Sequence, residues 1–220
     1  MIKTVSTIYN TILTIIAPPF CAYCKKFLID ELVFCAQCKS NIIPIVSITR
    51  PITKKYSMKV FAVSDYKDPL KKLILAKRWG AIAASRQLGQ LLWKMSYIKQ
   101  VNFDYIVPIP LHWTRFARRG FNQAQEIAQV IAQESGKPVI NLLKRPKRTA
   151  YQSQLTYAQR SQNLKNAFLL NNVATNNYKN KHLLLVDDLM TTGATLHAGA
   201  RALLQLKPQT ITVAVICRVI

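Results

Sequence analysis

Acidic side chains are scarce in this sequence: nine Asp and Glu stand against 31 Lys and Arg in 220 residues. The formal net charge is therefore +22, with an isoelectric point near 10.1. The excess runs through most of the chain, because residues 1–60, 61–125 and 126–180 carry +6, +8 and +6, and residues 181–220 only +2. Such a charge implies polyanionic partners, namely nucleic acid, anionic lipid or phosphate-rich small molecules. The alternative is that a generally basic proteome or the needs of solubility set this charge.

Long apolar runs are also missing. No stretch approaches the roughly 18 apolar residues of a transmembrane span. Thr, Ser and Asn interrupt the N-terminal MIKTVSTIYNTILTIIAPPF, and no small-residue cleavage site precedes the first cysteine, so we do not expect a signal peptide. Apolar residues at helical spacing over 5–16 favour an amphipathic helix instead. The sequence predicts a cytoplasmic protein with no transmembrane segment and enough apolar material for one core plus a small appendage.

Cysteine is sparse but clustered, since four of the five cysteines fall in two CxxC pairs. The candidate metal ligands are Cys21, Cys24, Cys35 and Cys38. Four thiolates in two tight turns suit tetrahedral Zn²⁺, and four protein ligands leave no open position for a substrate, so the predicted role is structural. Two disulfides are the alternative, which a chain without an export signal disfavours. Cys217 is predicted to be a small buried apolar residue.

Strand-like and helix-like segments alternate from residue 60 onward. The predicted strands are 60–66, 105–110, 139–143, 182–186 and 210–219. The predicted helices are 69–80, 84–97, 122–135 and 194–206, with Gly136 as a stop signal. This alternation favours an α/β fold with a parallel sheet.

Two segments show little periodicity. Residues 41–59 contain two prolines and are interpreted as a linker, and the basic, Gln-rich residues 144–166 as a loop followed by a polar helix. The predicted organisation is therefore residues 1–58, comprising an N-terminal helix, the zinc module and a linker, followed by a second domain over residues 59–220.

The apolar run LLLV ends on two adjacent acids, Asp187 and Asp188, followed by a hydroxyl-rich turn and a helix. Ligands of parallel α/β sheets collect at the carboxyl ends of strands. Amides at the start of a helix favour a phosphate, whereas the two carboxylates repel phosphate and suit sugar hydroxyls. The pattern predicts a 5-phosphoribosyl group bound by Asp187, Asp188, Leu189, Met190, Thr191, Thr192, Gly193, Ala194 and Thr195. The alternative is a plain helix N-terminus with acids matched to its dipole.

The run LLLVDDLMTTGAT (183–195) resembles the 5-phosphoribosyl-1-pyrophosphate (PRPP) signature of type I phosphoribosyltransferases. The segments VPIPLHWTRFARRGFNQAQEIA (107–128) and RPKRTAYQSQLTYAQRSQNLKNAF (145–168) resemble one branch, the ComF competence-protein family, as do YKDPLKKLILAKRWG and the double CxxC. The resemblance covers nearly the full length. Gln154 and Lys147 depart from the family pattern, which has glycine and arginine there.

The resemblance implies a type I phosphoribosyltransferase fold with a small N-terminal zinc-binding module. In phosphoribosyl transfer, Mg²⁺ and basic side chains take up charge on the departing pyrophosphate, so no nucleophile is needed and no catalytic residue is assigned. The candidate pyrophosphate side, after Pro110, comprises Leu111, His112, Arg115 and Arg118. The candidate DNA-binding residues are Lys144, Arg145, Lys147 and Arg148, which either cover the PRPP site or contact a phosphate backbone.

Two functions remain open. The first is a PRPP-binding protein that also binds single-stranded DNA during DNA uptake in natural transformation, for which the resemblance implies helicase or recombination machinery as partners. The charge of +22 favours it. The second is an active PRPP-dependent phosphoribosyltransferase of nucleotide salvage or metabolism, although no residues that would read an acceptor base are recognisable. Four aromatic residues beside basic ones either stack on bases or pack in the core: Trp79, Trp113, Tyr151 and Tyr157.

Overall fold

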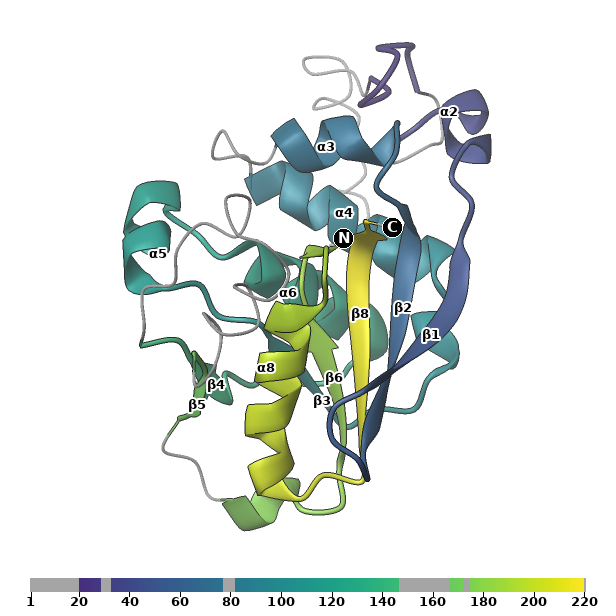
Figure 1. The fold of residues 1–220 in the computed structure, drawn as a ribbon. Coiled ribbons are helices and arrows are strands. Elements are labelled where there is room, and N and C mark those ends of the chain that lie inside the picture. The colour runs from purple at the N-terminus through teal and green to yellow at the C-terminus, as the bar shows by residue number, and fades with distance from the viewer. Residues whose placement is uncertain (1–19, 29–32, 77–81, 147–166, 172–174, 220) are drawn as a thin grey trace, which may run out of the picture.

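A computed structural model of the chain describes residues 20–28, 33–76, 82–146, 167–171 and 175–219 (Figure 1). Its centre is a sheet in the order β1-β2-β8-β6-β3. These strands are β1 (Ile45–Pro51), β2 (Ser57–Asp65), β8 (Thr210–Arg218), β6 (His182–Val186) and β3 (Tyr105–Pro108). β2, β8, β6 and β3 run parallel, and β1 pairs antiparallel with β2 at the edge. A short strand, β7 (Leu189–Met190), also pairs with β8 in parallel.

The remaining elements surround this sheet. The helices are α2 (Ala36–Ser40), α3 (Leu70–Ala76), α4 (Ile82–Met95), α5 (Trp113–Arg119), α6 (Gln123–Ser135) and α8 (Ala194–Leu203). Short 3-10 turns are η2 (Tyr97–Gln100), η4 (Thr175–Tyr178) and η5 (Leu204–Leu206). A separate two-stranded antiparallel sheet joins β4 (Leu143–Lys144) to β5 (Leu169–Leu170). Within the ranges that the structure describes, no helix has the length and apolarity to cross a bilayer.

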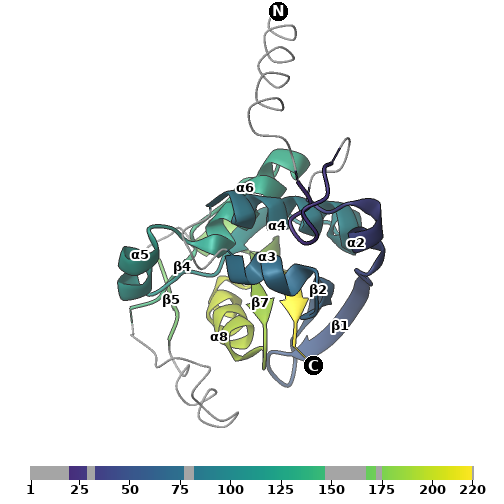
Figure 2. The same ribbon diagram turned by 90° about the horizontal axis from the view of Figure 1, so that it is seen from above.

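Both faces of the sheet are covered by helices. Leu184 and Val186 of β6 pack into the apolar cluster that contains α4 and α6. Leu183 and Leu185 alternate with them and pack into the cluster that contains α8. Figure 2 shows α4 and α6 on one side of the sheet and α8 on the other. This two-sided burial, worth about 1.5–3 kcal/mol for each fully buried aliphatic side chain, explains why residues 183–186 of β6 form an unbroken apolar run.

Several predicted elements are confirmed with the local causes that the sequence indicated. The helix predicted over 122–135 is α6: the Asn122 side chain accepts a hydrogen bond from the Ala124 amide at 3.2 Å, and Gly136 ends the helix with φ 70°. The predicted strand 182–186 is β6, and the predicted helix 194–206 is α8 continued by η5. The α/β class with a mostly parallel sheet is thus confirmed.

Other predictions need correction. The linker interpretation of residues 41–59 is wrong, because β1 pairs with β2 and adds an antiparallel edge strand to the sheet. The strand predicted over 139–143 is reduced to one parallel bridge between Val139 and Ile106, and the chain then turns away into β4. The helix predicted over 5–16 and residues 147–166 of the polar segment lie outside the described residues.

The cysteine-containing module packs on the body of the protein. Leu28, Val33 and Phe34 belong to the same buried cluster as α3 and α4. The Tyr23 hydroxyl donates to an oxygen of Asp68 at 3.3 Å, and the Lys72 ammonium lies 4.2 Å from the centre of the Tyr23 ring. The domain boundary between residues 58 and 59 stays a prediction, and its two sides share this apolar cluster.

Gly89 sets the distance between α4 and α6. A Cβ atom at this position would lie 2.9 Å from Val130 Cβ and 3.3 Å from the Ile127 Cα. Both are atoms near or in the backbone of α6, which cannot rotate away. We therefore expect Gly89→Ala to lower the free energy of unfolding by about 1–3 kcal/mol through overpacking. This loss is expected even though alanine is about 1 kcal/mol more favourable than glycine in a helix interior.

Urea denaturation of the full chain measures this effect. Gln90→Ala, at the next position of α4 where the side chain is half-buried, is the matched control and should change stability by less than about 0.5 kcal/mol. Equal or greater stability of Gly89→Ala would show that α4 and α6 separate without cost.

Candidate functional site

Asp187 and Asp188 follow directly on the carboxyl end of β6. Main-chain hydrogen bonds from the Asp187 amide to Ala214 (3.1 Å) and from the Ile216 amide to Asp188 (3.2 Å) hold this segment against β8. The Asp187 carboxylate accepts a hydrogen bond from the Asp188 amide at 2.8 Å. Both acids are half-buried. The pair is thus held at the strand-end edge, where parallel sheets bind ligands.

The segment between the acids and α8 is not a simple turn. Leu189 and Met190 form β7 and continue the pairing with β8. Gly193 then adopts φ 78°, a left-handed conformation that suits glycine and strains other residues. The Thr192 hydroxyl accepts a hydrogen bond from the Ala194 amide at 3.3 Å. α8 begins at once, so its first amides and its dipole lie beside the threonine turn, an arrangement that favours an anion.

The loop after β3 leaves the sheet next to the acid pair. The Ile109 amide donates to the Val186 carbonyl at 2.9 Å, one residue before Asp187. His112, from the predicted pyrophosphate side, is 3% exposed. Its Nδ1 accepts from the Thr114 amide at 3.3 Å and caps α5, and its Nε2 donates to the Pro146 carbonyl at 3.2 Å. Both ring nitrogens therefore have structural partners.

Arg145 is buried, with 7% of its surface exposed. Its guanidinium carbon lies 5.1 Å from the centre of the Phe168 ring. The pKa of Arg145 is lowered to about 10: burial is the largest cause, the nearby charge of Arg115 acts in the same direction, and Asp187 acts in the opposite direction. The residue therefore stays cationic at neutral pH. The fold thus brings together three segments that the sequence analysis treated separately. They contain Arg115, Arg145 and Asp187, and the charges of Arg115 and Asp187 both act on Arg145.

The other predicted basic residues are distributed differently. Lys144 is exposed at the end of β4, and Arg118 is exposed on α5. Leu111 is half-buried in the loop before α5. Lys147 and Arg148 lie outside the described residues. Of the predicted basic run, Arg145 thus faces the protein interior and Lys144 faces solvent.

Gln123 is a residue that sequence reasoning missed. It is 2% exposed in the first turn of α6, directly after the pyrophosphate-side loop. Its Oε1 accepts a hydrogen bond from the Arg119 guanidinium at 3.1 Å, and the described residues give its Nε2 no partner. A buried donor without a partner costs free energy, so this amide is suited to a polar ligand. The sequence signal was its place in RGFNQA, next to the Asn122 cap.

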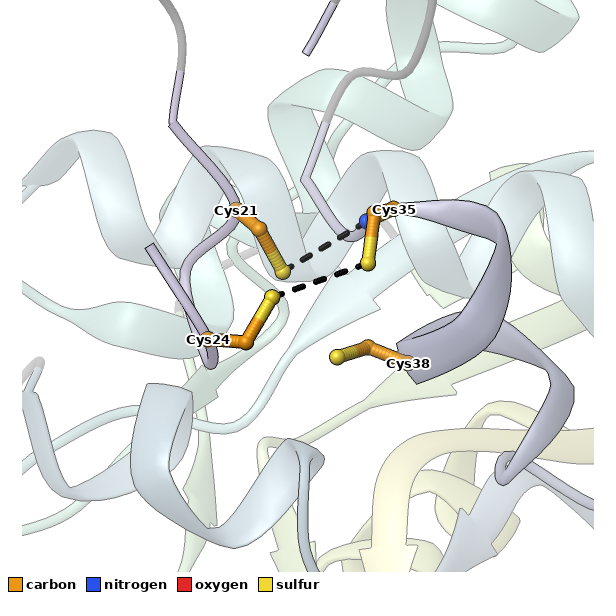
Figure 3. A group of neighbouring side chains, drawn as sticks. All are labelled: Cys21, Cys24, Cys35 and Cys38. Carbon is orange, nitrogen blue, oxygen red and sulfur yellow. Dashed lines mark hydrogen bonds between the residues drawn. The ribbon is translucent and has the colours of Figure 1, made fainter. Parts of the chain in front are cut away.

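The four clustered cysteines form the second candidate site. The sulfur atoms of Cys21, Cys24, Cys35 and Cys38 lie within 4.8 Å of one another (Figure 3). Cys24 and Cys35 sulfurs are 3.7 Å apart, close to the ~3.8 Å edge expected for a tetrahedron with Zn–S bonds of about 2.3 Å. None of the five cysteines, all within the described ranges, forms a disulfide. The cluster suits a tetrahedral metal ion such as Zn²⁺.

The thiol environment fits this assignment. Although burial raises the pKa of Cys21, hydrogen bonds from the main chain of Cys24, Cys35 and Tyr23 lower it to about 6. For Cys38, burial and then the neighbouring thiols raise the pKa to about 12. Four sulfurs this close cannot all ionise without a cation among them, so metal binding would be accompanied by proton release.

Comparison with known proteins agrees with this geometry. Residues 96–220 match the family model of the phosphoribosyl transferase domain, and the chain is a member of that family. It is 31% identical over 203 residues to Competence protein F of Haemophilus influenzae, covering 88% of this chain and 87% of that protein. It is 32% identical over 208 residues to the DNA utilization protein YhgH of Salmonella typhimurium, covering 90% and 89%. The chain therefore belongs to the ComF competence-protein family.

Solved structures are more distant. Adenine phosphoribosyltransferase from Thermoanaerobacter pseudethanolicus is 15% identical, with a TM-score of 0.41 over 83% of this chain and 98% of that chain. The chain spans about a quarter of the larger PRPP amidotransferase from B. subtilis: 26% of that chain matches 61% of this one, at 19% identity and a TM-score of 0.41.

Replacement of Cys21 and Cys35 by serine should release the metal and lower the thermal midpoint of the whole protein. The physical reason is that the module shares a buried apolar cluster with α3 and α4, so its unfolding uncovers their apolar surface. Elemental analysis for zinc and a thermal melt of the full chain measure the two effects.

Cys217→Ala is the control, because this cysteine is buried in β8 and is not part of the cluster. It should keep one zinc ion per chain whatever its effect on the midpoint. A wild-type protein that purifies without metal and melts at the same temperature as the double variant would contradict the assignment.

Proposed function

We propose that the chain binds PRPP or another 5-phosphoribosyl group at the carboxyl end of β6. The sugar hydroxyls are held by Asp187 and Asp188, and the 5-phosphate by the turn Thr191–Thr195 at the start of α8. The observation that carries this proposal is the order of groups along one short segment: two carboxylates, a threonine turn with a left-handed Gly193, and a helix N-terminus. The sugar hydroxyls suit the two carboxylates, and the 5-phosphate suits the threonine turn and the helix N-terminus that follow them.

Arg115 and Arg145 supply the pyrophosphate side of this site. A cation buried beside another cation is destabilised, and an anion placed near both would relieve the repulsion. Mg²⁺ bound with PRPP would take up part of the same charge; oxygen ligands of the kind it prefers are available from the two aspartates and from PRPP itself. Gln123 is suited to donate a hydrogen bond from the same side. His112 holds the α5 end of the loop and has no chemical role in this proposal.

The second part of the proposal is a role in DNA handling during DNA uptake. The names of the relatives, Competence protein F and DNA utilization protein, support it, and so does the net charge of +22, which binding one small anion does not require. Single-stranded DNA is the proposed polymer, and helicase or recombination machinery the proposed protein partners. We place this activity in the cytoplasm.

An active phosphoribosyltransferase is the second candidate. The gathering of Arg115 and Arg145 beside Asp187 favours it, because stabilising a departing pyrophosphate is the electrostatic work that such a transfer needs. Incubation with PRPP, Mg²⁺ and a panel of bases decides between the two candidates. Pyrophosphate released with one base would establish turnover, and none released with any base, alongside DNA binding, would favour the handling role.

Changing both Asp187 and Asp188 to asparagine should lower the affinity for PRPP by at least about tenfold. Each carboxylate is proposed to accept charge-assisted hydrogen bonds from the ribose, worth about 1.5–3 kcal/mol apiece. Simple electrostatics gives the opposite sign, since removing two negative charges should tighten binding of an anion. The direction of the change therefore tests the ribose assignment, and isothermal titration calorimetry with PRPP and Mg²⁺ measures it.

The control variant is Asp68→Asn with Glu134→Gln, two exposed acids on α3's N-terminal side and on α6. It raises the net charge by the same two units and should leave PRPP affinity unchanged or slightly higher. Unchanged or tighter binding by the Asp187 and Asp188 variant would overturn the proposed ribose contacts.

Binding of single-stranded DNA should weaken steeply with salt. If about four phosphates are neutralised, affinity should fall roughly fiftyfold between about 50 and 200 mM monovalent salt. Replacing Lys144, Lys147 and Arg148 by alanine should flatten the slope of log affinity against log salt by about two units. Fluorescence anisotropy of a labelled oligonucleotide gives both quantities.

The matched control removes three exposed lysines around the β1–β2 turn, Lys54, Lys55 and Lys59. In this control, the slope of log affinity against log salt should change by less than half as much as in the variant of Lys144, Lys147 and Arg148. Equal slopes in the two variants would mean that net charge alone drives binding, and a wild-type affinity independent of salt would refute the DNA-handling role.

A further inference from the structure

α5 exposes two large aromatic side chains. Trp113 is 70% exposed and Phe116 is 50% exposed, and none of the residues of this helix is buried. Because the two stand three positions apart, they are neighbours on one face of the helix. For Trp113 the core-packing alternative is therefore wrong; Trp79, Tyr151 and Tyr157 lie outside the described residues.

The helix that carries this aromatic pair is fixed at both ends. His112 caps its N-terminus and is tied through Nε2 to the Pro146 carbonyl. The centre of the His112 ring also lies 5.8 Å from that of the Trp113 ring, with an angle of 41° between the ring planes. Gly120, with φ 78°, ends the helix and donates its amide to the Phe116 carbonyl at 2.7 Å. The pair is thus presented on a short, anchored element.

Three of the other five residues of the same helix are arginines. Helical geometry puts Arg119 three positions after Phe116, beside the aromatic pair, and puts Arg115 and Arg118 farther around the helix. Arg115 and Arg119 are half-buried, whereas Arg118 is exposed. Arg115 interacts with the charge of Arg145 beside Asp187. α5 therefore separates the proposed phosphoribosyl site from an exposed aromatic surface, with positive charge along its edge.

The chemistry of this surface selects among three kinds of partner. A second copy of the chain, docked about a two-fold axis, would bring the arginines of α5 against those of its mate. A bilayer surface is normally bound through a longer apolar face than two turns of helix provide. A single-stranded nucleic acid offers both base faces for the rings and phosphates for the arginines, the usual combination in such sites.

We propose that Trp113 and Phe116 stack on successive bases of single-stranded DNA whose phosphates pass along the arginine edge of α5. This inference rests on the proposed DNA-handling function and names the surface that performs it. The strand would run past the mouth of the phosphoribosyl site, since α5 follows directly on the loop that leaves β3 beside Asp187.

The test compares two oligonucleotides of equal length and charge, oligothymidine and an abasic strand, on the full zinc-loaded chain. Trp113→Ala with Phe116→Ala should weaken oligothymidine binding by about tenfold or more. The salt slope should stay unchanged, because no cation is lost. Affinity for the abasic strand should also stay unchanged. A joint loss of affinity for both strands would overturn the stacking role.

Two control variants accompany the test. Tyr56→Ala removes an exposed aromatic residue that follows two lysines at the β1–β2 turn. This turn lies at the lower end of the sheet in Figure 1, while α5 lies beside the upper end. The variant should bind as the wild type does. Trp113→Phe keeps a ring and should retain most of the affinity.

The outcomes separate this inference from the function on which it rests. Wild-type binding to oligothymidine with no loss in the double variant overturns the stacking surface and leaves DNA handling intact. No binding of either strand by the wild type overturns both, while PRPP calorimetry reports on the phosphoribosyl site independently. A defect of the double variant confined to binding of anionic vesicles would assign the surface to lipid and also overturn the proposal.

Discussion

The parallel pairing of β3, β6 and β8 is the constraint on which the candidate site depends. Parallel strands end at the same edge, so residues far apart in the sequence arrive together there. The hydrogen bond from Ile109 to Val186 brings the loop after β3 to the first aspartate. A one-residue slip of β6 would exchange the side chains on its two packed faces and would carry Asp187 away from that loop. The covering of both faces of β6 by helices makes such a slip costly, and this fixes the site.

Within this frame, the most unusual energetic feature is a buried arginine near a second arginine. Arg145 is 7% exposed and feels Arg115 as well as Asp187. Burying a charge costs free energy that a fold recovers only through partners. The Phe168 ring and the charge of Asp187 offset part of that cost. A phosphate-rich ligand would offset more, so this cation is better understood as part of a ligand site than as a device for stability.

The sequence predicted best where a local cause acts alone. Asn122 and Gly136 bound α6 because capping depends on a few neighbouring residues. β1 was missed because Pro44 and Pro51, next to and within that strand, favour a linker interpretation; an edge strand tolerates proline where it needs no partner on one side. The burial of Arg145 could not be predicted, since a basic run looks the same whether one member turns inward or all face water. The Nε2 contact of His112 depends on Pro146, 34 residues away, and no local pattern indicates it.

The same geometry explains how one chain could carry both of the proposed sites, one for a phosphoribosyl group and one for single-stranded DNA. A site for a single phosphoribosyl group must enclose its ligand, and the described residues around it are half-buried or buried: Asp187, Asp188, Arg145 and Gln123. A surface for a polymer must stay open, and α5 has no buried residue at all. Because α5 begins four residues after Ile109, whose amide contacts β6, both proposed surfaces are positioned by the same strand end. Arg115 and its helix connect the two proposed surfaces, which gives a physical route by which a phosphoribosyl ligand could influence how DNA is held.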